Sequence, residues 1–199
     1  MLMLKKPSKD GILWLRTVVD TRERNKNSQR LASPLPDIET ILRNVTSHRF
    51  RTLLDGKDAY EQIRVEPLDI DKTLFATPDG TMVSLVMQIG DCNVCAMYQS
   101  LMNHIFSDFI GVFMDVYLND IVIYSDSPEE HVKHVKQVID RLHDNKFFLS
   151  SHKLLFFKDE LNILGHVIDV DLWGVGHCFA WQVTSPCVNC SFLHVQMLF

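Results

Sequence analysis

The spacing of apolar residues along the chain switches between a helical and a strand-like period. Residues 33–45 and 98–109 repeat apolar side chains at helical spacing, which predicts two helices with one buried face each. Residues 127–146 begin with Ser127, Pro128 and Glu130, a capping box with proline at the first helical position, and predict a third helix. The inner face of this helix is predicted to consist of Val135, Val138, Ile139 and Leu142.

Shorter apolar runs bounded by turn residues lie between the helices and predict strands. The first of them leads into a basic loop, and the second ends in a turn at Asp55. Two further segments read as hairpins, one around a Pro-Asp-Gly turn and one with Asn119 and Asp120 at its tip. Strands are predicted within residues 13–25, 50–55, 73–87, 113–125, 153–157 and 161–169.

The order of these elements predicts the fold class. Hairpins and helices interleave without the regular alternation of a doubly wound parallel sheet. We therefore predict an α+β fold in which an antiparallel sheet is backed by helices. With 199 residues and 46% hydrophobic residues, the chain is large enough to bury a core as one or two domains.

The last thirty residues differ in composition from the rest. From Val170 to Phe199 there is no Lys or Arg, Asp171 is the single acid, and three of the five cysteines gather there. Neither helical nor strand periodicity continues. We predict one domain over residues 1–169 and a separate, poorly ordered cysteine-rich tail over 170–199.

Charge and cysteine content narrow the cellular setting. The net charge is -5, yet residues 1–30 hold eight basic residues against three acidic ones. Such a stretch can bind phosphates, although its charge alone favours a solvated surface. The start lacks the long apolar region of a secretory signal, no apolar run reaches the length of a membrane span, and five cysteines fit reduced thiols. An intracellular protein with no membrane partner is predicted.

Two carboxylates are candidates for chemistry. Asp55 ends a strand and Asp120 lies at a hairpin tip. Carboxylates brought together from separate strands suit Mg²⁺, a hard cation that prefers oxygen ligands. Since Asp and Asn are also ordinary turn residues, a structural turn is the favoured interpretation of either motif alone.

Asp55 and Asp120 belong to a series of six motifs that follow one another along the chain. The motifs are TVVDTRERNK, PLPDIETIL, LLDGKDAYEQIRV, YQSLMNHIF, VYLNDIVIYS and LGHVI. This series resembles the reverse transcriptase of gypsy-type long-terminal-repeat retrotransposons over residues 1–169. The resemblance implies the fingers and palm of a right-hand polymerase without a thumb, an RNA template, a DNA primer, deoxynucleoside triphosphates, and Mg²⁺ or Mn²⁺ as cofactor. It also implies a cytoplasmic particle or the nucleus as location.

The resemblance also assigns roles to single residues. It implies that Asp55 and Asp120 bind metal, and that Tyr60 is the steric gate that rejects a 2′-hydroxyl. Asp58 and Ala59 would present backbone N–H groups to the triphosphate, while Arg16 grips its phosphates. The remaining implied sites are Gln99, on the helix that supports the nucleotide pocket, and the primer-holding turn of Leu164, Gly165 and His166.

Asn119 departs from the family pattern. The YLND stretch occupies the Tyr-x-Asp-Asp site, so a carboxamide stands where a second aspartate belongs. A carboxamide is neutral and offers one oxygen, whereas a carboxylate offers two and a negative charge. Asp115 lies about 13 Å back along the strand and is too distant to substitute. Polymerase activity is therefore predicted to be severely impaired or absent.

Two further departures concern the surroundings of the site. Val94-Cys95-Ala96 lacks the proline that the family more often has at this place. Residues 170–199 stand where the family continues into a thumb. A frameshift or an unspliced intron is the simplest explanation of that tail.

Two other functions remain open. Cys92-x-x-Cys95 and Cys187-x-x-Cys190, with His177 and Cys178 nearby, could form a zinc site of a binding module, although their separation is large for one. Alternatively, the chain could be a non-catalytic nucleic-acid binder that retains the basic fingers. That function predicts salt-sensitive binding to RNA–DNA duplexes without extension.

Overall fold

A computed structural model describes residues 2–6, 14–150, 153–158, 160–168 and 181–182. Side chains are described from Val18 to Ile168 within these ranges. The predicted boundary at residue 169 and nearly all of the predicted tail fall outside the described residues. In the part of the chain that is described, no helix is long and apolar enough to cross a membrane.

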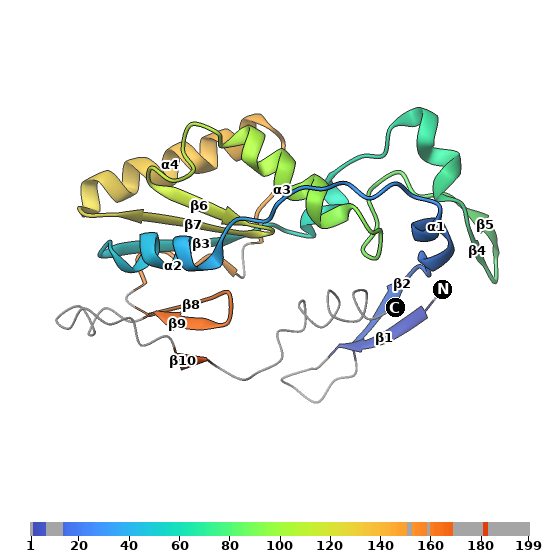
Figure 1. The fold of residues 1–199 in the computed structure, drawn as a ribbon, viewed down its shortest axis with the longest axis horizontal. Coiled ribbons are helices and arrows are strands. Elements are labelled where there is room, and N and C mark those ends of the chain that lie inside the picture. The colour runs from blue at the N-terminus through green and yellow to red at the C-terminus, as the bar shows by residue number, and fades with distance from the viewer. Residues whose placement is uncertain (1, 7–13, 151–152, 159, 169–180, 183–199) are drawn as a thin grey trace.

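A three-stranded antiparallel sheet lies at the centre of the molecule (Figure 1). Its strands are β3 (Phe50–Asp55), β7 (Asp120–Ser125) and β6 (Met114–Tyr117), in that order. The pairing of β3 with β7 runs from Phe50 opposite Ser125 to Asp55 opposite Asp120. The predicted strand at 50–55 and the predicted hairpin at 113–125 are both confirmed.

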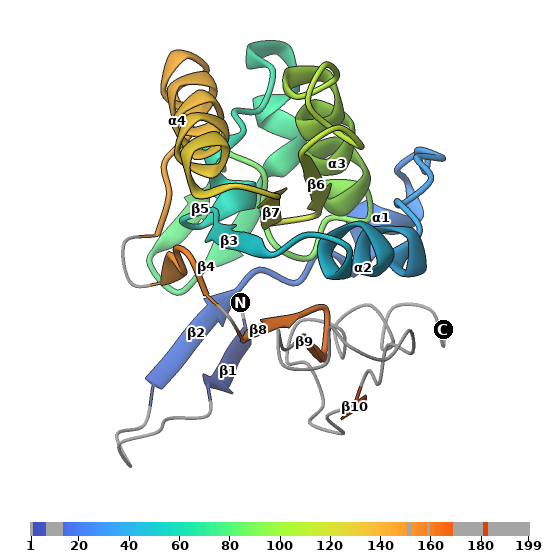
Figure 2. The same cartoon turned by 90° about the vertical axis from the view of Figure 1, so that its left-hand side faces the viewer.

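The two faces of the sheet bury different sets of residues because side chains alternate along a strand. Leu54, Ile121 and Ile123 face the helices α3 (Val94–Ile105) and α4 (Pro128–Asp144). Leu53, Val122 and Tyr124 face α2 (Ile38–Thr46) and the hairpin of β8 (Leu161–Ile163) and β9 (His166–Ile168). Figure 2 shows the sheet between these two layers.

Local capping signals fix where the helices begin. Asp37 accepts a hydrogen bond from the Thr40 backbone N–H at the start of α2. Ser127 does the same for Glu130 at the start of α4, as the capping box predicts. The predicted inner stripe of α4 is wrong at Ile139, which is 36% exposed, whereas the imidazole of His131 is fully buried.

The remaining elements form a lobe at the end of the molecule away from α4 (Figure 1). The predicted basic loop after the first strand is wrong, because residues 22–26 form a short helix whose cations are paired within the chain. Arg22 pairs with Asp20, and Arg24 with Asp91. The lobe comprises β1 (Leu2–Lys6), β2 (Trp14–Val18), α1 (Arg22–Lys26), the 3-10 helix η2 (Pro67–Thr73), and the confirmed hairpin β4 (Phe75–Thr77) and β5 (Gly80–Met82). The 3-10 helix η1 (Ala59–Gln62) instead packs against α3.

Two strand predictions near the C-terminal side need correction. Residues 153–157 form no continuous strand, and only Leu155 bridges to Leu53 of β3. Residues 161–169 are not one strand but the hairpin β8–β9, which turns at Leu164 and Gly165. Both turn residues have positive φ, 53° and 80°, which is the pattern of a two-residue type I′ turn. One more short strand, β10 (Trp181–Gln182), pairs with β9.

Candidate active site

Asp55 and Asp120 lie directly opposite each other at one end of the central sheet. The Gly56 backbone N–H donates to the Asn119 carbonyl, which makes Asp55 and Asp120 a non-hydrogen-bonded pair of the ladder. In such pairs the Cα atoms are about 4.5 Å apart and the side chains share one face of the sheet. The two carboxylates predicted to bind metal are therefore brought together.

The turn between β6 and β7 consists of Leu118 and Asn119. Leu118 has φ of 53°, a conformation that costs a residue with a Cβ roughly 1–2 kcal/mol. Gln99, fully buried on α3, stabilises this turn with both ends of its amide. Its Oε1 accepts from the Leu118 N–H at 2.7 Å, and its Nε2 donates to the Val116 carbonyl at 3.0 Å. Gln99 thus holds the hairpin tip in place, and its predicted contact with a nucleotide stays a prediction.

The electrostatics of the pair are asymmetric. Burial, together with the negative charge of Asp55, raises the pKa of Asp120 to about 6. The ammonium of Lys153 acts in the opposite direction on Asp120 and forms an ion pair with Asp55 at 3.0 Å. Like charges that share a half-buried site favour a bound cation, because a cation relieves their mutual repulsion.

Asn119 contacts the pair as a donor. Its side-chain Nδ2 donates to Asp55 Oδ2 at 3.1 Å. A carboxylate at this position would instead add a third negative group beside Asp55 and Asp120. The structure therefore places the departure from the Tyr-x-Asp-Asp pattern directly against a predicted metal ligand.

Tyrosines border the carboxylates on the helix side. Tyr60 of η1 meets Tyr98 of α3 edge to face, with ring centroids 5.4 Å apart. The Cys95 thiol lies 3.9 Å from the Tyr60 hydroxyl. Burial holds the pKa of the Tyr60 hydroxyl far above its usual range, so the phenol is neutral. A Cβ at Gly56 would come within 3.2 Å of the Tyr98 hydroxyl, which explains why glycine follows Asp55.

Comparisons with known proteins decide the family. Residues 5–168 match the family described as reverse transcriptase (RNA-dependent DNA polymerase). The chain belongs to the reverse transcriptase family. It is 33% identical over 167 residues to the retrovirus-related Pol polyprotein from transposon 297 of Drosophila melanogaster, 84% of this chain and 16% of that protein.

Other relatives confirm the retrotransposon branch that the motifs indicate. The Pol polyprotein from transposon gypsy of the same fly is 31% identical over 78% of this chain and 15% of its own length. The transposon Tf2-3 polyprotein of Schizosaccharomyces pombe is 35% identical over 81% of this chain and 12% of its own length. The chain thus spans less than a fifth of these curated relatives.

Solved structures confirm the polymerase fold. The foamy viral protease–reverse transcriptase in complex with an RNA/DNA hybrid superposes with a TM-score of 0.71 at 20% identity, covering 84% of this chain and 22% of that one. A complex of the same enzyme type with double-stranded DNA gives 0.74 at 20% identity, with 84% and 29% covered. We expect the central sheet with α2, α3 and α4 to form the palm of this reverse transcriptase domain, and the distal lobe to form its fingers.

The predicted nucleotide-binding residues lie on three elements of the domain, with Gln99 on α3 and the others at η1 and β2. Asp58, with φ of 45°, and Ala59 stand at the start of η1, immediately before Tyr60 and close in sequence to Asp55. Arg16 lies in β2 opposite Leu4 of β1, and its side chain is outside the described set. The structure thus gives backbone positions for these residues, and their contacts with a nucleotide stay predictions.

The predicted primer-holding residues lie in a separate hairpin, which packs on the sheet face that Leu53 and Val122 share with Asp55 and Asp120. Leu164 and Gly165 form the turn of the β8–β9 hairpin, and His166 begins β9. Leu164 packs against the core of Leu53, Val122 and Ile163. This hairpin is a separate element from the strands that carry Asp55 and Asp120. A primer held by the hairpin would therefore have to reach from it to the two carboxylates.

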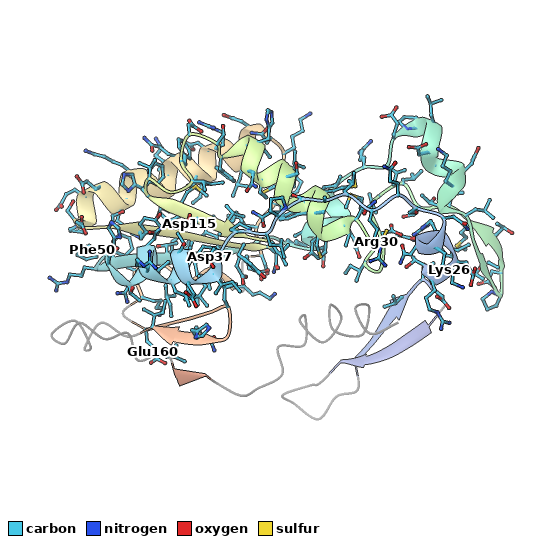
Figure 3. All side chains as sticks on the ribbon, viewed as in Figure 1. Lys26, Arg30, Asp37, Phe50, Asp115 and Glu160 are labelled. Carbon is cyan, nitrogen blue, oxygen red and sulfur yellow. The ribbon has the colours of Figure 1, made fainter. Side chains whose placement is uncertain are left out.

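Asp115 has a structural role away from the pair. It lies opposite Val122 in the ladder and accepts hydrogen bonds from Asn44 at 2.9 Å and Tyr124 at 3.1 Å. Figure 3 shows Asp115 along the sheet, in the part of the molecule that also holds Phe50. Its carboxylate is buried and engaged, in agreement with the view that it does not substitute for Asn119.

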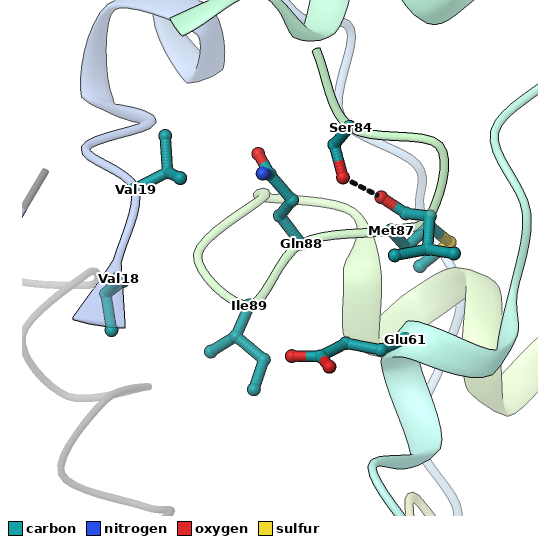
Figure 4. Close-up of a pocket in the computed structure, with 8 residues that line it drawn as sticks. Val18, Val19, Glu61, Ser84, Met87, Gln88 and Ile89 are labelled. Carbon is teal, nitrogen blue, oxygen red and sulfur yellow. Dashed lines mark hydrogen bonds between the residues drawn. The ribbon is translucent and has the colours of Figure 1, made fainter. Parts of the chain in front are cut away.

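The structure contains a pocket of about 210 Å³ that the sequence did not predict. It opens between the end of β2 and the loop of residues 84–89, with Glu61 of η1 on one side (Figure 4). The Ser84 hydroxyl donates to the Val86 carbonyl at 2.7 Å and fixes this loop. The pocket lies beside the helix that carries Tyr60. No motif identifies it, because its lining comes from distant apolar residues: Val18, Val19, Val86, Met87 and Ile89.

The alternative zinc site can be compared with the structure only in part. Cys92 and Cys95 are free thiols at the start of α3. Among the described residues, no group of three or more His, Cys, Asp or Glu side chains could hold a metal ion. Cys178, Cys187, Cys190 and His177 lie outside the described residues, so the four-cysteine site stays an untested alternative.

Proposed function

We propose that this chain supplies the fingers and palm of a reverse transcriptase active site, which uses an RNA template, a DNA primer and deoxynucleoside triphosphates. The observation that carries the proposal is the pairing of Asp55 with Asp120 at the open end of the palm sheet. The foamy viral relatives bound to an RNA/DNA hybrid and to double-stranded DNA support these partners. The proposed location of this activity is intracellular, in a cytoplasmic particle or in the nucleus.

The donor set fits a divalent cation. Asp55 and Asp120 offer carboxylate oxygens, the ligands that Mg²⁺ and Mn²⁺ prefer, and burial together with the charge of Asp55 raises the pKa of Asp120. When bound there, the metal supplies activation of a hydroxyl and charge neutralisation in phosphoryl transfer. Asp55 and Asp120 are therefore the proposed metal ligands, with Asn119 at the degenerate position of the second aspartate.

The chain's own residues would orient the substrates. Tyr60, braced by the ring of Tyr98, would lie under the sugar and exclude a 2′-hydroxyl. The backbone N–H groups of Asp58 and Ala59 would donate to the triphosphate, and Arg16 would bind its phosphates. The turn of Leu164 and Gly165 with His166 would hold the primer end.

Asn119 makes catalysis inefficient in this proposal. Its amide N–H already donates to Asp55, and its neutral side chain removes one negative charge from the metal-binding set. A loss of a few kcal/mol of transition-state stabilisation slows a reaction by two to three orders of magnitude, roughly. Severe impairment of primer extension follows.

Primer extension on an RNA template tests the proposal. With Mg²⁺ or Mn²⁺, N119D is expected to extend the primer about a hundredfold to a thousandfold faster than the parent chain. N119D/D120N, which removes a second ligand, is the matched control and should lose this gain. Extension by the parent at the rate of N119D would refute the impairment, and inactivity of both would refute the polymerase proposal for this chain.

A second candidate function is suggested by Asn119 itself. A chain that retains the polymerase fold but lacks a ligand could bind RNA–DNA duplexes without extending them. Fluorescence anisotropy with a labelled duplex would detect binding that weakens as salt rises, because phosphate contacts release counterions. Salt-sensitive binding by both the parent and N119D, with no extension by either, would favour this function.

A further inference from the structure

The carboxylate of Asp55 is already occupied by donors of the protein. Lys153 Nζ lies 3.1 Å from Oδ1 and 3.0 Å from Oδ2, and Asn119 Nδ2 donates to Oδ2 at 3.1 Å. Both oxygens of a proposed metal ligand therefore accept hydrogen bonds from groups that have no lone pair to offer a cation. The Asp55 side chain is only 13% exposed, so water competes weakly with these donors.

Backbone hydrogen bonds on both sides of Lys153 hold this residue beside Asp55. The Ser150 N–H donates to the Asp55 carbonyl at 2.9 Å, and the Lys153 N–H donates to the Ser150 carbonyl at 3.0 Å. Two residues further on, Leu155 and Leu53 exchange backbone hydrogen bonds at 2.9 Å. The chain is thus fixed to the edge of β3 on both sides of Lys153, although 98 positions separate the lysine from Asp55.

Charge decides how strongly this lysine competes with a metal. Asp55 and Asp120 carry two negative charges when ionised, and the ammonium neutralises one of them. Asn119 contributes no charge, so a divalent cation that enters must displace or tolerate a fixed positive charge. A lysine ammonium and a divalent cation repel each other most strongly where both would share one carboxylate.

We propose that Lys153 is a resident counter-cation of Asp55 that competes with divalent metal, and that Asn119 shifts this competition in favour of the lysine. The inference rests on the proposed function, since it concerns the same Asp55–Asp120 site. It makes Lys153 a residue that sets the metal affinity of the site. It also explains how a chain with one ligand replaced keeps its remaining carboxylates compensated.

Mn²⁺ binding, measured by the loss of the free-ion electron paramagnetic resonance signal, tests the inference without any need for activity. K153M is expected to lower the Mn²⁺ dissociation constant about tenfold, equivalent to about 1.4 kcal/mol. K153Q, which keeps a hydrogen-bond donor but loses the charge, should give most of this gain. K158M is the matched control, because Lys158 is exposed and its removal changes the net charge equally.

The same series is measured in the N119D background, where affinity is highest, and with D55N added. Tighter binding in K153M and K153Q but not in K158M, abolished by D55N, supports the inference. Equal dissociation constants with and without Lys153, in a protein whose binding still requires Asp55, would overturn it and leave the proposed function standing. Mn²⁺ binding that D55N does not change would instead overturn the metal site of the proposed function.

Because Lys153 is 62% exposed, K153M should fold normally. Thermal unfolding in chelator provides a second readout. Loss of the ammonium leaves the Asp55–Asp120 repulsion uncompensated, so K153M should unfold at a lower temperature than K158M in chelator, and Mn²⁺ should abolish this difference. An identical melting temperature for both variants in chelator, unchanged by Mn²⁺, would count against the counter-cation.

Discussion

The two ends of the β3–β7 ladder carry two polar clusters with opposite character. At one end Asp55 and Asp120 face each other with Asn119 and Lys153 beside them. Near the other end, the imidazole of His131 is fully buried between hydroxyl groups of both strands. It lies 2.7 Å from Thr52 Oγ1 and 2.9 Å from Ser125 Oγ, and His134 Nδ1 lies 2.8 Å from the same serine.

The difference shows how a structural polar cluster can be told from a functional one. A neutral His131 can complete a chain of hydrogen bonds through Thr52 and Ser125, so its polar atoms need no ligand. The Asp55–Asp120 pair places like charges together at a half-buried position, and among the described residues Lys153 and Asn119 donate hydrogen bonds to Asp55. Both clusters are polar and partly buried, but only the Asp55–Asp120 pair favours a bound cation.

The largest expected effect separates the clusters by activity. In the N119D background, D55N should reduce primer extension by about two to three orders of magnitude, since it removes a metal ligand. T52V, an isosteric change in the His131 cluster, should leave the extension rate within about threefold at a temperature where the protein is folded. Initial rates with the same primer–template provide the comparison, and similar losses in both variants would contradict it.

Gln99 connects the candidate site to the core. Its replacement should lower the free energy of unfolding more than replacement of its neighbour Asn103. Q99L leaves the Leu118 N–H and the Val116 carbonyl without their amide partner and is expected to cost about 2–3 kcal/mol of unfolding free energy. N103A removes only the third hydrogen bond of the same amide and should cost less than about 1 kcal/mol. Urea denaturation measures both, and equal costs would show that the turn does not depend on Gln99.

The two clusters should respond to pH with opposite sign. The folded-state pKa of Asp120 is raised to about 6, so its contribution to stability is present below an unfolded pKa of about 4 and is lost as pH rises through 6. Burial lowers the pKa of His131 to about 4, so its contribution is present above an unfolded pKa of about 6.5 and is lost as pH falls through 4.

Unfolding experiments between pH 4 and 7 in chelator can resolve this opposition. Relative to the parent, D120N should gain stability as pH rises, by about 2 kcal/mol across the range. H131N should show the reverse trend, with its deficit smallest at pH 4 and largest at pH 7. Parallel pH profiles for the two variants would mean that the clusters do not differ as described.

A smaller effect concerns the β8–β9 turn, which unlike the Leu118–Asn119 turn has glycine where φ is strongly positive. Gly165 has φ of 80°, so G165A is expected to cost roughly 1 kcal/mol. G165N, which tolerates the left-handed region better, should cost less and serves as the control. Melting temperatures distinguish the two, and a neutral G165A would contradict the turn conformation.

Much of the palm could be predicted from local patterns. Apolar runs bounded by turn residues predict β3 and the β6–β7 hairpin, and the capping box predicts the start of α4. These signals depend only on residues close in sequence, so they can be recognised without knowledge of the fold. The prediction of Ile139 as an inner residue was wrong because hydrophobic periodicity overlooks a polar residue such as His131 that is buried by hydrogen bonds.

What the sequence could not show depends on contacts between distant segments. The pairing of Asp55 with Asp120 was inferred from a family resemblance, whereas its register and the ion pair with Lys153 emerge only when the strands are packed. The position of Gln99 under the Leu118 turn is likewise a tertiary contact. The strand predicted at 153–157 failed because a single bridge at Leu155 replaces a full ladder.

The most direct measurement is the anomalous scattering of Mn²⁺ in crystals of N119D. The account predicts a peak whose nearest protein atoms are carboxylate oxygens of Asp55 and Asp120, with Lys153 Nζ displaced from its contact with Asp55. A peak elsewhere in the molecule, with the lysine still bound to both Asp55 oxygens, would contradict it.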